Sequence, residues 1–484
     1  MNFKKYFARK PVDELIEEAE SSQELTRAFG AWQLIMLGIG AIIGAGIFVL
    51  IGSAAGAHAG PAVTLSFILS ALACACAGLC YAELASSIPI AGSSYTYAYA
   101  SLGEIVAWII AGMIVLTYIV GGASVASGWS GYMVSFLADY GINIPPQFTV
   151  TTGTIVTLAD GTQTVGVCNL AAILIALAIT YVVYLGTEAS AWINTIIVTA
   201  KMLVLCGFIL IGAAYIDPNN WSPFIPENTG SFGAFGWSGV IGGASIVFLA
   251  FSGFDAVSTA AQEAKNPQKD LPIGILGSLL VAAITYIAVA AVLTGVAHYS
   301  ELNVAQPIAV AVDKMGMPWF STVIKLGAIV GITSVLLAMI YSTVRVLYTV
   351  AKDGLLPSLF RTIHPKHKTP HILTITIGSL IAILSTTLPI SELAGLANFG
   401  ILVTFSIVCF GTLFLRYRFP DLPRPFKCPL VPWIPLAGII MFVTIIAGLS
   451  SETYKYAAIW TSFLILVYIG YGSKNSKLLQ SKSL

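Results

Sequence analysis

Apolar stretches of about 20 residues recur along the chain, and each is long enough to cross the roughly 30 Å hydrocarbon core of a membrane. Only 9% of the 484 residues are charged, whereas soluble domains carry about 25%. A soluble globule is therefore excluded, and the sequence predicts an all-α integral membrane protein with about twelve transmembrane helices. The predicted spans are residues 33–56, 60–84, 105–137, 169–187, 190–215, 238–262, 271–298, 319–350, 370–388, 392–416, 431–450 and 454–472.

The charged residues indicate how the chain lies in the membrane. The chain has 23 Lys and Arg against 22 Asp and Glu, so the net charge favours no nucleic-acid partner. Nearly all Lys and Arg fall in the two terminal segments and in alternate loops, as expected of cytoplasmic segments. We therefore expect a multi-pass protein of the cell inner (plasma) membrane with both termini cytoplasmic.

The chain contains no long flexible linker, which predicts one membrane domain. Its first thirty residues are polar and lack the apolar core of a signal peptide, so the first span is expected to be retained. The outer loop Pro145–Val167 is rich in Thr and Gly and is expected to form β-like or irregular cover. The predicted divisions are a cytoplasmic segment 1–30, five helices in 31–216, five helices in 217–417, two helices in 418–472 and a cytoplasmic tail 473–484.

Two glycine clusters lie in mid-span, where lipid cannot hydrogen-bond to an opened backbone. The first span holds four glycines in the nine residues Gly38–Gly46, and the sixth combines Gly239–Gly243 with the run Phe251–Asp255. These spans begin two successive blocks of five helices, and interrupted helices at matching positions are typical of an inverted-repeat transporter. Close packing through small residues is the alternative reading of either cluster.

A broken helix offers free N–H groups at one half and free carbonyls at the other. This chemistry suits the two charged ends of an α-amino acid. Gly253 would allow the second opening, as the glycines of the first span allow the first. The predicted ligands are the N–H groups around Gly44, Ala45 and Gly46 for the carboxylate, and carbonyls near Ile42, Ile43, Phe251 and Ser252 for the ammonium.

Lys201 lies about ten residues from either end of the fifth predicted span, or roughly 15 Å from water. Snorkelling cannot bridge that distance, and an intramembrane lysine is a candidate functional residue. Because burial favours the neutral amine, we expect Lys201 to load and release the proton that drives transport. A static interhelical hydrogen bond or ion pair is the alternative.

Asp255 follows the second proposed opening, where it would recognise the substrate, hold the next half-helix or pair with another helix. The sequence indicates no cofactor and no metal site. The five His lie near span ends, and Cys74, Cys76 and Cys80 do not share one helical face.

Several motifs together resemble the amino acid, polyamine and organocation permeases, most closely the cationic amino acid transporter subgroup and its bacterial relatives. They are the glycine-rich first span, Phe251–Thr259 leading to Glu263, Asn266–Pro272, and Gly128–Tyr132. The likeness covers nearly the whole chain. It implies two inverted five-helix repeats of the LeuT type plus two extra helices, with the substrate held where the first and sixth spans unwind. It also implies that Lys201 takes a sodium position of sodium-coupled relatives.

This chain departs from that family at two positions of the expected side-chain pocket. Bacterial members often carry Glu where this chain has Thr117, and an aromatic lid where it has Leu249. Leu249 is expected to give a roomier or looser lid. With Asp255 as the one acid close to the proposed site and none at position 117, a small or medium neutral amino acid is slightly favoured over a cationic one. The rest of the pocket is expected from Val120, Gly121, Phe254 and the stretch Thr333–Met339.

We therefore predict a proton-coupled amino acid permease that works by alternating access and is not an enzyme. The alternatives are a cationic (Arg or Lys) transporter, an amino acid exchanger with a permanently charged Lys201 and, more distantly, a channel, a sensor or an intramembrane enzyme. The expected partners are the amino acid, the proton and the lipid bilayer. The sequence leaves open whether a small single-span protein is also a partner.

Overall fold

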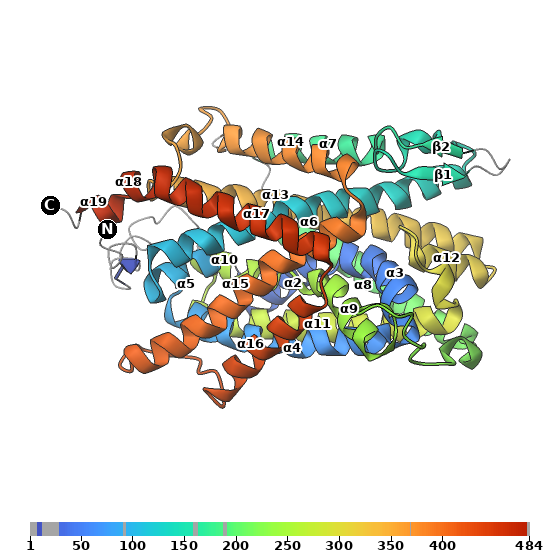
Figure 1. Cartoon of the computed structure of the whole chain (residues 1–484), viewed down its shortest axis with the longest axis horizontal. Helices are drawn as coiled ribbons and strands as arrows, with labels where there is room; N and C mark the ends of the chain where they lie inside the picture. Colours follow the sequence, from blue (N-terminus) through green and yellow to red (C-terminus); the bar gives the residue numbers. More distant parts are fainter. Residues whose placement is uncertain are drawn as a thin grey trace.

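The structure is a computed structural model that describes residues 7–11, 29–90, 93–157, 163–186, 191–367 and 369–481. Long helices lie side by side along the longest axis of the molecule (Figure 1). Most of the predicted segment 1–30, and the last residues of the predicted tail 473–484, fall outside the described residues.

The first half of the chain consists of helices, the loops that join them and one hairpin. Its helices are α2 (Ala31–Ile42), α3 (Ile51–Ser53), α4 (Val63–Ser87), α5 (Ser93–Ser101), α6 (Glu104–Asp139), α7 (Leu170–Tyr184) and α8 (Ala191–Gly212). The strands β1 (Ile155–Thr157) and β2 (Gln163–Val165) pair antiparallel with Ile155 opposite Val165. They lie in the loop expected to be β-like, so that prediction is confirmed.

The second half consists of helices and the loops that join them. Its helices are α9 (Gly236–Val247), α10 (Ala256–Thr259), α11 (Pro267–Val296), α12 (Pro307–Lys314), α13 (Pro318–Lys352), α14 (His371–Thr387), α15 (Ile390–Arg418), α16 (Trp433–Ala447), α17 (Ser451–Val467), α18 (Ser473–Asn475) and α19 (Lys477–Ser481). Proline opens α11, α12 and α13, where its fixed φ fits the first helical turn and its missing N–H costs nothing.

Every predicted span is mainly helical where the structure describes it, and the first and sixth spans are interrupted. Within the described residues, eight helical stretches are long and apolar enough to cross a membrane, and three more apolar helices, α7, α14 and α16, are shorter. The stretch Ala31–Ser87 contains two of the predicted spans, which are separated by a turn at Gly60, where φ is +60°. The all-α membrane architecture is thus confirmed, whereas the number of twelve crossings and the repeat symmetry stay predictions.

The helices α2, α4, α6, α11, α13 and α15 pack against one another and form the centre of the bundle. The two ends of the described chain meet beside this centre. The Glu104 amide donates to the Ala8 carbonyl at 3.0 Å. The buried Glu104 carboxylate accepts hydrogen bonds from Tyr99, Tyr468 and Ser476. The start of α6 therefore anchors both ends of the described chain.

Candidate functional site

The first span is interrupted where its glycines cluster. Helix α2 ends at Ile42, and Ile43 is extended with φ −79° and ψ 108°. The helix resumes after Gly44, whose carbonyl accepts from the amides of Ile47 and Phe48. Because Gly44 is the first acceptor of the resumed helix, the N–H groups of Ala45 and Gly46 have no acceptor within it.

The sixth span is interrupted at the second predicted position. Helix α9 tightens into a 3₁₀ turn over Phe248–Phe251, the backbone opens at Ser252 with ψ 135°, and α10 follows Asp255. Gly253 has φ +119°, a conformation that L side chains rarely adopt, and a Cβ there would lie 2.8 Å from the Ala41 carbonyl. Only glycine fits at this position.

The two interruptions lie against each other. A Cβ on Gly46 would lie 2.2 Å from the Cβ of Ala250, while Gly253 abuts Ala41 on the other side of the opening. Glycine therefore brings the backbones of the first and sixth spans together at two points.

Lys201 of α8 reaches into the first interruption. It is 1% exposed, and its Nζ donates to the carbonyls of Gly40 and Ile43, both at 2.7 Å. These carbonyls belong to the end of α2, where the helix opening removes their usual partners. Among the described residues the Lys201 ammonium bonds carbonyls and forms no ion pair. The static alternative expected from the sequence was an interhelical hydrogen bond or an ion pair, and Lys201 forms interhelical hydrogen bonds.

Tyr286 of α11 joins both interruptions, and sequence reasoning missed it. Its hydroxyl lies 2.9 Å from the Ile42 carbonyl and 2.9 Å from the Ala250 carbonyl. Its ring packs edge to face on Phe251 with centroids 5.2 Å apart. A tyrosine within a long apolar helix carries no spacing signal that would reveal such a partner.

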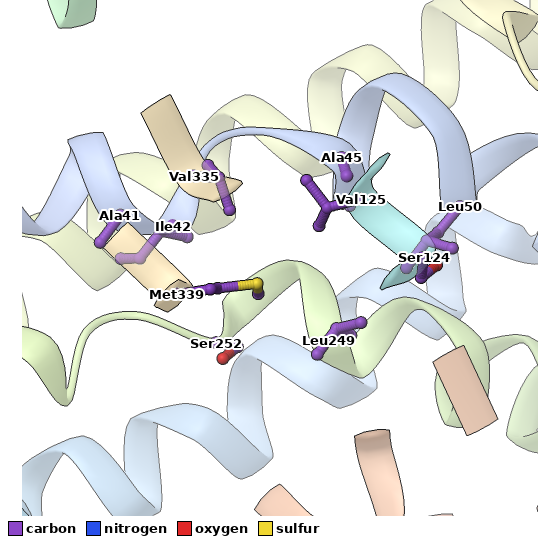
Figure 2. A pocket seen from close by; sticks show the side chains of 11 residues that line it. Ala41, Ile42, Ala45, Leu50, Ser124, Val125, Leu249, Ser252, Val335 and Met339 are labelled. Atoms are coloured by element: carbon purple, nitrogen blue, oxygen red, sulfur yellow. The ribbon is translucent and has the colours of Figure 1, made fainter. Parts of the chain in front are cut away.

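A small pocket lies between the interruptions (Figure 2). The pocket is narrow and partly open to solvent. The walls are mainly aliphatic, no lining residue carries a charged side chain, and the polar ones are two serines. The lining residues are Ala41, Ile42, Ala45, Gly46, Leu50, Ser124, Val125, Leu249, Ser252, Val335 and Met339.

Five of the predicted substrate ligands line this pocket: Ile42, Ala45, Gly46, Leu249 and Ser252. Val335 and Met339 lie in the predicted stretch of the eighth span. Sequence reasoning missed Ala41, Leu50, Ser124 and Val125. The sequence signal that could have found them was proximity to predicted residues. Ala41 and Leu50 lie within about one turn of predicted residues of the first span, and Ser124 and Val125 lie close to Gly121 on the third span.

The other predicted ligands lie around the pocket and do not line it. Gly44 abuts the Val335 side chain, and Ile43 is held by Lys201. Phe254 packs on Tyr81 and Phe405 rather than on the pocket.

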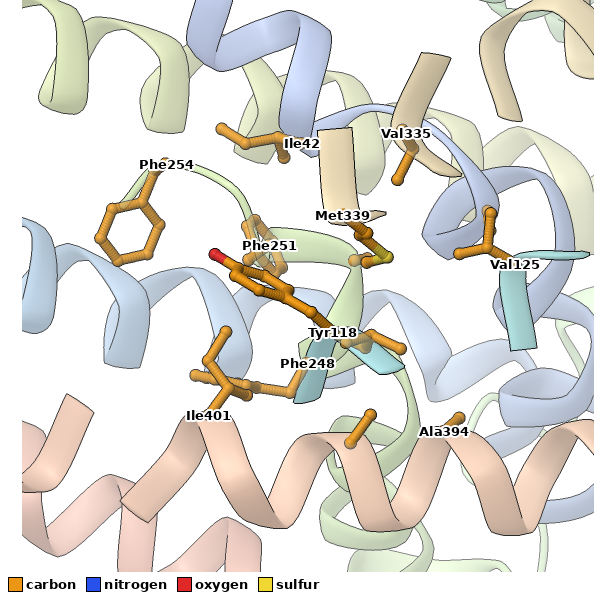
Figure 3. Close-up of a cluster of buried hydrophobic side chains, with 14 of the residues drawn as sticks. Ile42, Tyr118, Val125, Phe248, Phe251, Phe254, Val335, Met339, Ala394 and Ile401 are labelled. Carbon is orange, nitrogen blue, oxygen red and sulfur yellow. The ribbon is translucent and has the colours of Figure 1, made fainter. Parts of the chain in front are cut away.

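Asp255 is bonded to the protein. Its Oδ2 accepts from the Tyr118 hydroxyl at 3.0 Å, and its Oδ1 accepts from the Gly253 amide at 3.2 Å. Figure 3 shows the Tyr118 ring extending from α6 towards Phe254 at this junction. Of the three roles expected for Asp255, the contacts match holding the half-helix and pairing with another helix.

Thr117 lies next to Tyr118 but contacts α15. Its hydroxyl donates to the Ala397 carbonyl at 3.0 Å. A Cβ built on Gly400 would lie 2.5 Å from the Thr117 hydroxyl oxygen. The threonine therefore closes a helix contact behind the pocket.

Comparison with known proteins identifies the family of the chain. The family model described as amino acid permease matches residues 29–472. The chain is 43% identical to the branched-chain amino acid permease BcaP of Bacillus subtilis (strain 168), over 98% of this chain and 99% of that one. It is 40% identical to the methylthioribose transporter of the same organism, with the same coverage. It is 34% identical to human cationic amino acid transporter 4, over 83% of this chain and 62% of that one.

These matches confirm the resemblance seen in the motifs, and they extend over nearly the whole chain. They also agree with the non-enzymatic function expected from the sequence, since the matched relatives are permeases and transporters. The chain therefore belongs to the amino acid permease family, within the amino acid, polyamine and organocation superfamily, and is a multi-pass membrane transporter and not an enzyme.

Proposed function

We propose that this protein is a secondary active transporter that carries a neutral amino acid by alternating access. The pocket between the two interrupted helices is the observation that carries the proposal. Its walls are aliphatic and without charge, which suits an apolar side chain of small or medium size. A cationic side chain would be buried there without a counter-ion, at a high cost in free energy.

The backbone at the first interruption supports an amino acid as substrate. The amides of Ala45 and Gly46 begin a half-helix, and a substrate carboxylate placed there would bind free N–H groups at the positive end of the helix dipole. Val335, Met339 and Leu249 would then contact the side chain. The branched-chain permease of B. subtilis, with 43% identity, supports valine, leucine and isoleucine as the first candidates.

Lys201 supports proton coupling. A protonated Lys201 holds the carbonyls of Gly40 and Ile43 and so fixes the end of α2 beside the pocket. Loss of the proton would remove the charge and weaken both hydrogen bonds, since charge-assisted bonds are the stronger ones. The first interruption would then relax and release the substrate on the cytoplasmic side. A permanently charged Lys201 would instead give an amino acid exchanger.

The predicted architecture belongs to this proposal. We assign the first five predicted spans (residues 31–216) and the next five (residues 217–417) to two inverted repeats, with the last two spans outside them. The protein would lie in the plasma membrane with both termini in the cytoplasm. The contacts of Ala8 and Ser476 with Glu104 support placing the two ends on one side.

Uptake into proteoliposomes tests the proposal. The purified protein is reconstituted, and accumulation of radiolabelled leucine is measured with and without an inward proton gradient. Unlabelled valine, alanine, arginine and methylthioribose compete in separate reactions. We expect gradient-driven uptake that valine blocks and arginine does not. Competition by arginine alone contradicts a neutral substrate. Competition by methylthioribose alone would mean that the sugar is the substrate. Flux that needs internal amino acid but no proton gradient would mean that the protein is an exchanger.

A further inference from the structure

Asn398 of α15 is a buried amide that bonds to the sixth span where that span changes geometry. It is 0% exposed, and its Nδ2 donates to the carbonyls of Ser245 at 2.7 Å and Ile246 at 3.0 Å. Its Oδ1 has no partner among the described residues. The opposite orientation of the amide would set this oxygen against two carbonyl oxygens, so the N–H donors face the sixth span.

The two carbonyls lie just before the point at which the α-helix ends. Helix α9 ends at Val247, and the chain continues as a 3₁₀ turn over Phe248–Phe251. In a continuous α-helix the carbonyls of Ser245 and Ile246 would accept from amides four residues on. Those amides lie in the 3₁₀ turn, where an amide bonds three residues back. The change of geometry thus removes the α-helical donor of each carbonyl, and the Asn398 amide replaces both.

Helix α15 bonds to the third span as well. Ala397, the neighbour of Asn398, accepts a hydrogen bond from the Thr117 hydroxyl of α6 at 3.0 Å. Figure 3 shows α15 with Ala394 and Ile401 on the side towards the sixth span. Asn398 lies four and three residues from these two and therefore shares their face of the helix. Helix α15 thus holds the third and sixth spans, which both supply walls of the pocket, in a fixed register.

Leu249 connects this contact to the shape of the pocket. It lies within one helical turn of both bonded carbonyls, and it lines the pocket. A Cβ built on Gly121 of α6 would lie 3.6 Å from each of three side chains, those of Leu249, Ala397 and Met339. Leu249 therefore packs where α6, α13 and α15 meet. A shift of the 3₁₀ turn along the span would move its side chain into or out of the space for the substrate.

We propose that Asn398 is a positioning residue that determines which size of substrate side chain the pocket accepts. Its two hydrogen bonds set where the sixth span leaves α-helical geometry, and thereby how far the Leu249 side chain extends into the pocket. Asn398 itself does not line the pocket and acts through Leu249. The inference rests on the proposed function, because it concerns the selectivity among neutral amino acids.

Binding of two amino acids of different size tests the proposal. Wild type and Asn398→Leu, which removes both donors at similar volume, are purified as full chains in detergent. Unlabelled leucine and alanine compete with radiolabelled leucine, and the ratio of their affinities reports the fit of the pocket. We expect Asn398→Leu to lower the preference for leucine over alanine about tenfold, because a displaced wall loses contacts with the larger side chain. A purely structural role would lower the number of binding-competent molecules and leave the ratio unchanged.

Further variants separate positioning from general destabilisation. Thr404→Val removes a buried hydroxyl of α15 that bonds within its own helix, to the Gly400 carbonyl at 2.8 Å, and it should keep the wild-type ratio. Leu249→Ala should lower the ratio by itself. Adding Asn398→Leu to Leu249→Ala should change the ratio no further, since the residue through which Asn398 acts is gone. Asn398→Thr, which is smaller and keeps one donor, is measured in the same way if Asn398→Leu does not fold.

Three results overturn the proposal. They are an unchanged ratio in the Asn398 variant, an equal change in Thr404→Val, and a ratio that falls as far in the Leu249→Ala background as in the wild-type background. A wild-type protein that binds neither leucine nor alanine instead refutes the proposed function, and the role of Asn398 with it.

Discussion

Gly253 fixes the second opening through its own backbone geometry. Gly253→Ala combines an unfavourable φ with a clash against the Ala41 carbonyl, and we expect it to lower stability by about 1–3 kcal/mol or more. Thermal unfolding of the purified protein measures this loss. Gly230 has φ +99° but no atom within 4 Å of a built Cβ, so Gly230→Ala reports the backbone cost alone. Equal losses in the two variants would mean that the contact with Ala41 contributes nothing.

Lys201 carries the proposed coupling, and its charge can be removed with little change in length. Lys201→Met should abolish proton-driven accumulation in proteoliposomes while exchange across the membrane persists. Lys325 is a second buried lysine, but it pairs with Asp139 at 2.7 Å outside the pocket. Lys325→Met should therefore leave accumulation dependent on the gradient. A Lys201→Met protein that still concentrates leucine on a gradient would refute the coupling role.

The interrupted helices depend on side chains from their neighbours. Tyr286→Phe keeps the ring on Phe251 but removes the donor to both interruptions, and we expect a loss of about 1–3 kcal/mol in stability together with weaker leucine binding. Tyr132→Phe is the matched control, since the Tyr132 hydroxyl donates at 2.6 Å to the Phe48 carbonyl of the first span alone. Thermal unfolding and binding measured on both variants distinguish the roles. Binding that falls equally in both would show that joining the two helices has no special effect.

At the scale of the whole molecule, the buried Glu104 carboxylate binds the end of the described chain to the start of α6. Ser476→Ala removes one of the three hydroxyls on this carboxylate and should loosen the end of the chain by about 1–3 kcal/mol. Limited proteolysis followed by mass spectrometry would detect earlier cleavage after α17. Ser473→Ala is the control, because it removes an exposed hydroxyl that bonds within its own helix turn. The protease should cleave this variant at the wild-type rate. Identical cleavage of Ser476→Ala would show that Glu104 does not hold this segment.

The sequence predicted the helices and both interruptions, because length, apolarity and glycine determine them locally. It did not predict which side of a helix faces the pocket. Thr117 was expected in the pocket but contacts α15, and Tyr286 was not singled out at all. A helix that is apolar on all sides meets both lipid and protein with similar residues, so its periodicity does not mark the inner side. Asp255 likewise had three open roles, and only the position of Tyr118 distinguishes them.

The Tyr286 junction has a consequence for how the proposed transporter would open. A tyrosine hydroxyl has one hydrogen, yet it faces the carbonyls of both interrupted helices at equal distance. The two acceptors compete for it, so the junction is frustrated and neither helix holds the full bond. Separating the helices therefore costs about one shared hydrogen bond instead of two. The Tyr286 hydroxyl can keep its hydrogen bond to the helix that stays next to α11. A contact of this kind would align the pocket and still separate easily in the proposed transport cycle.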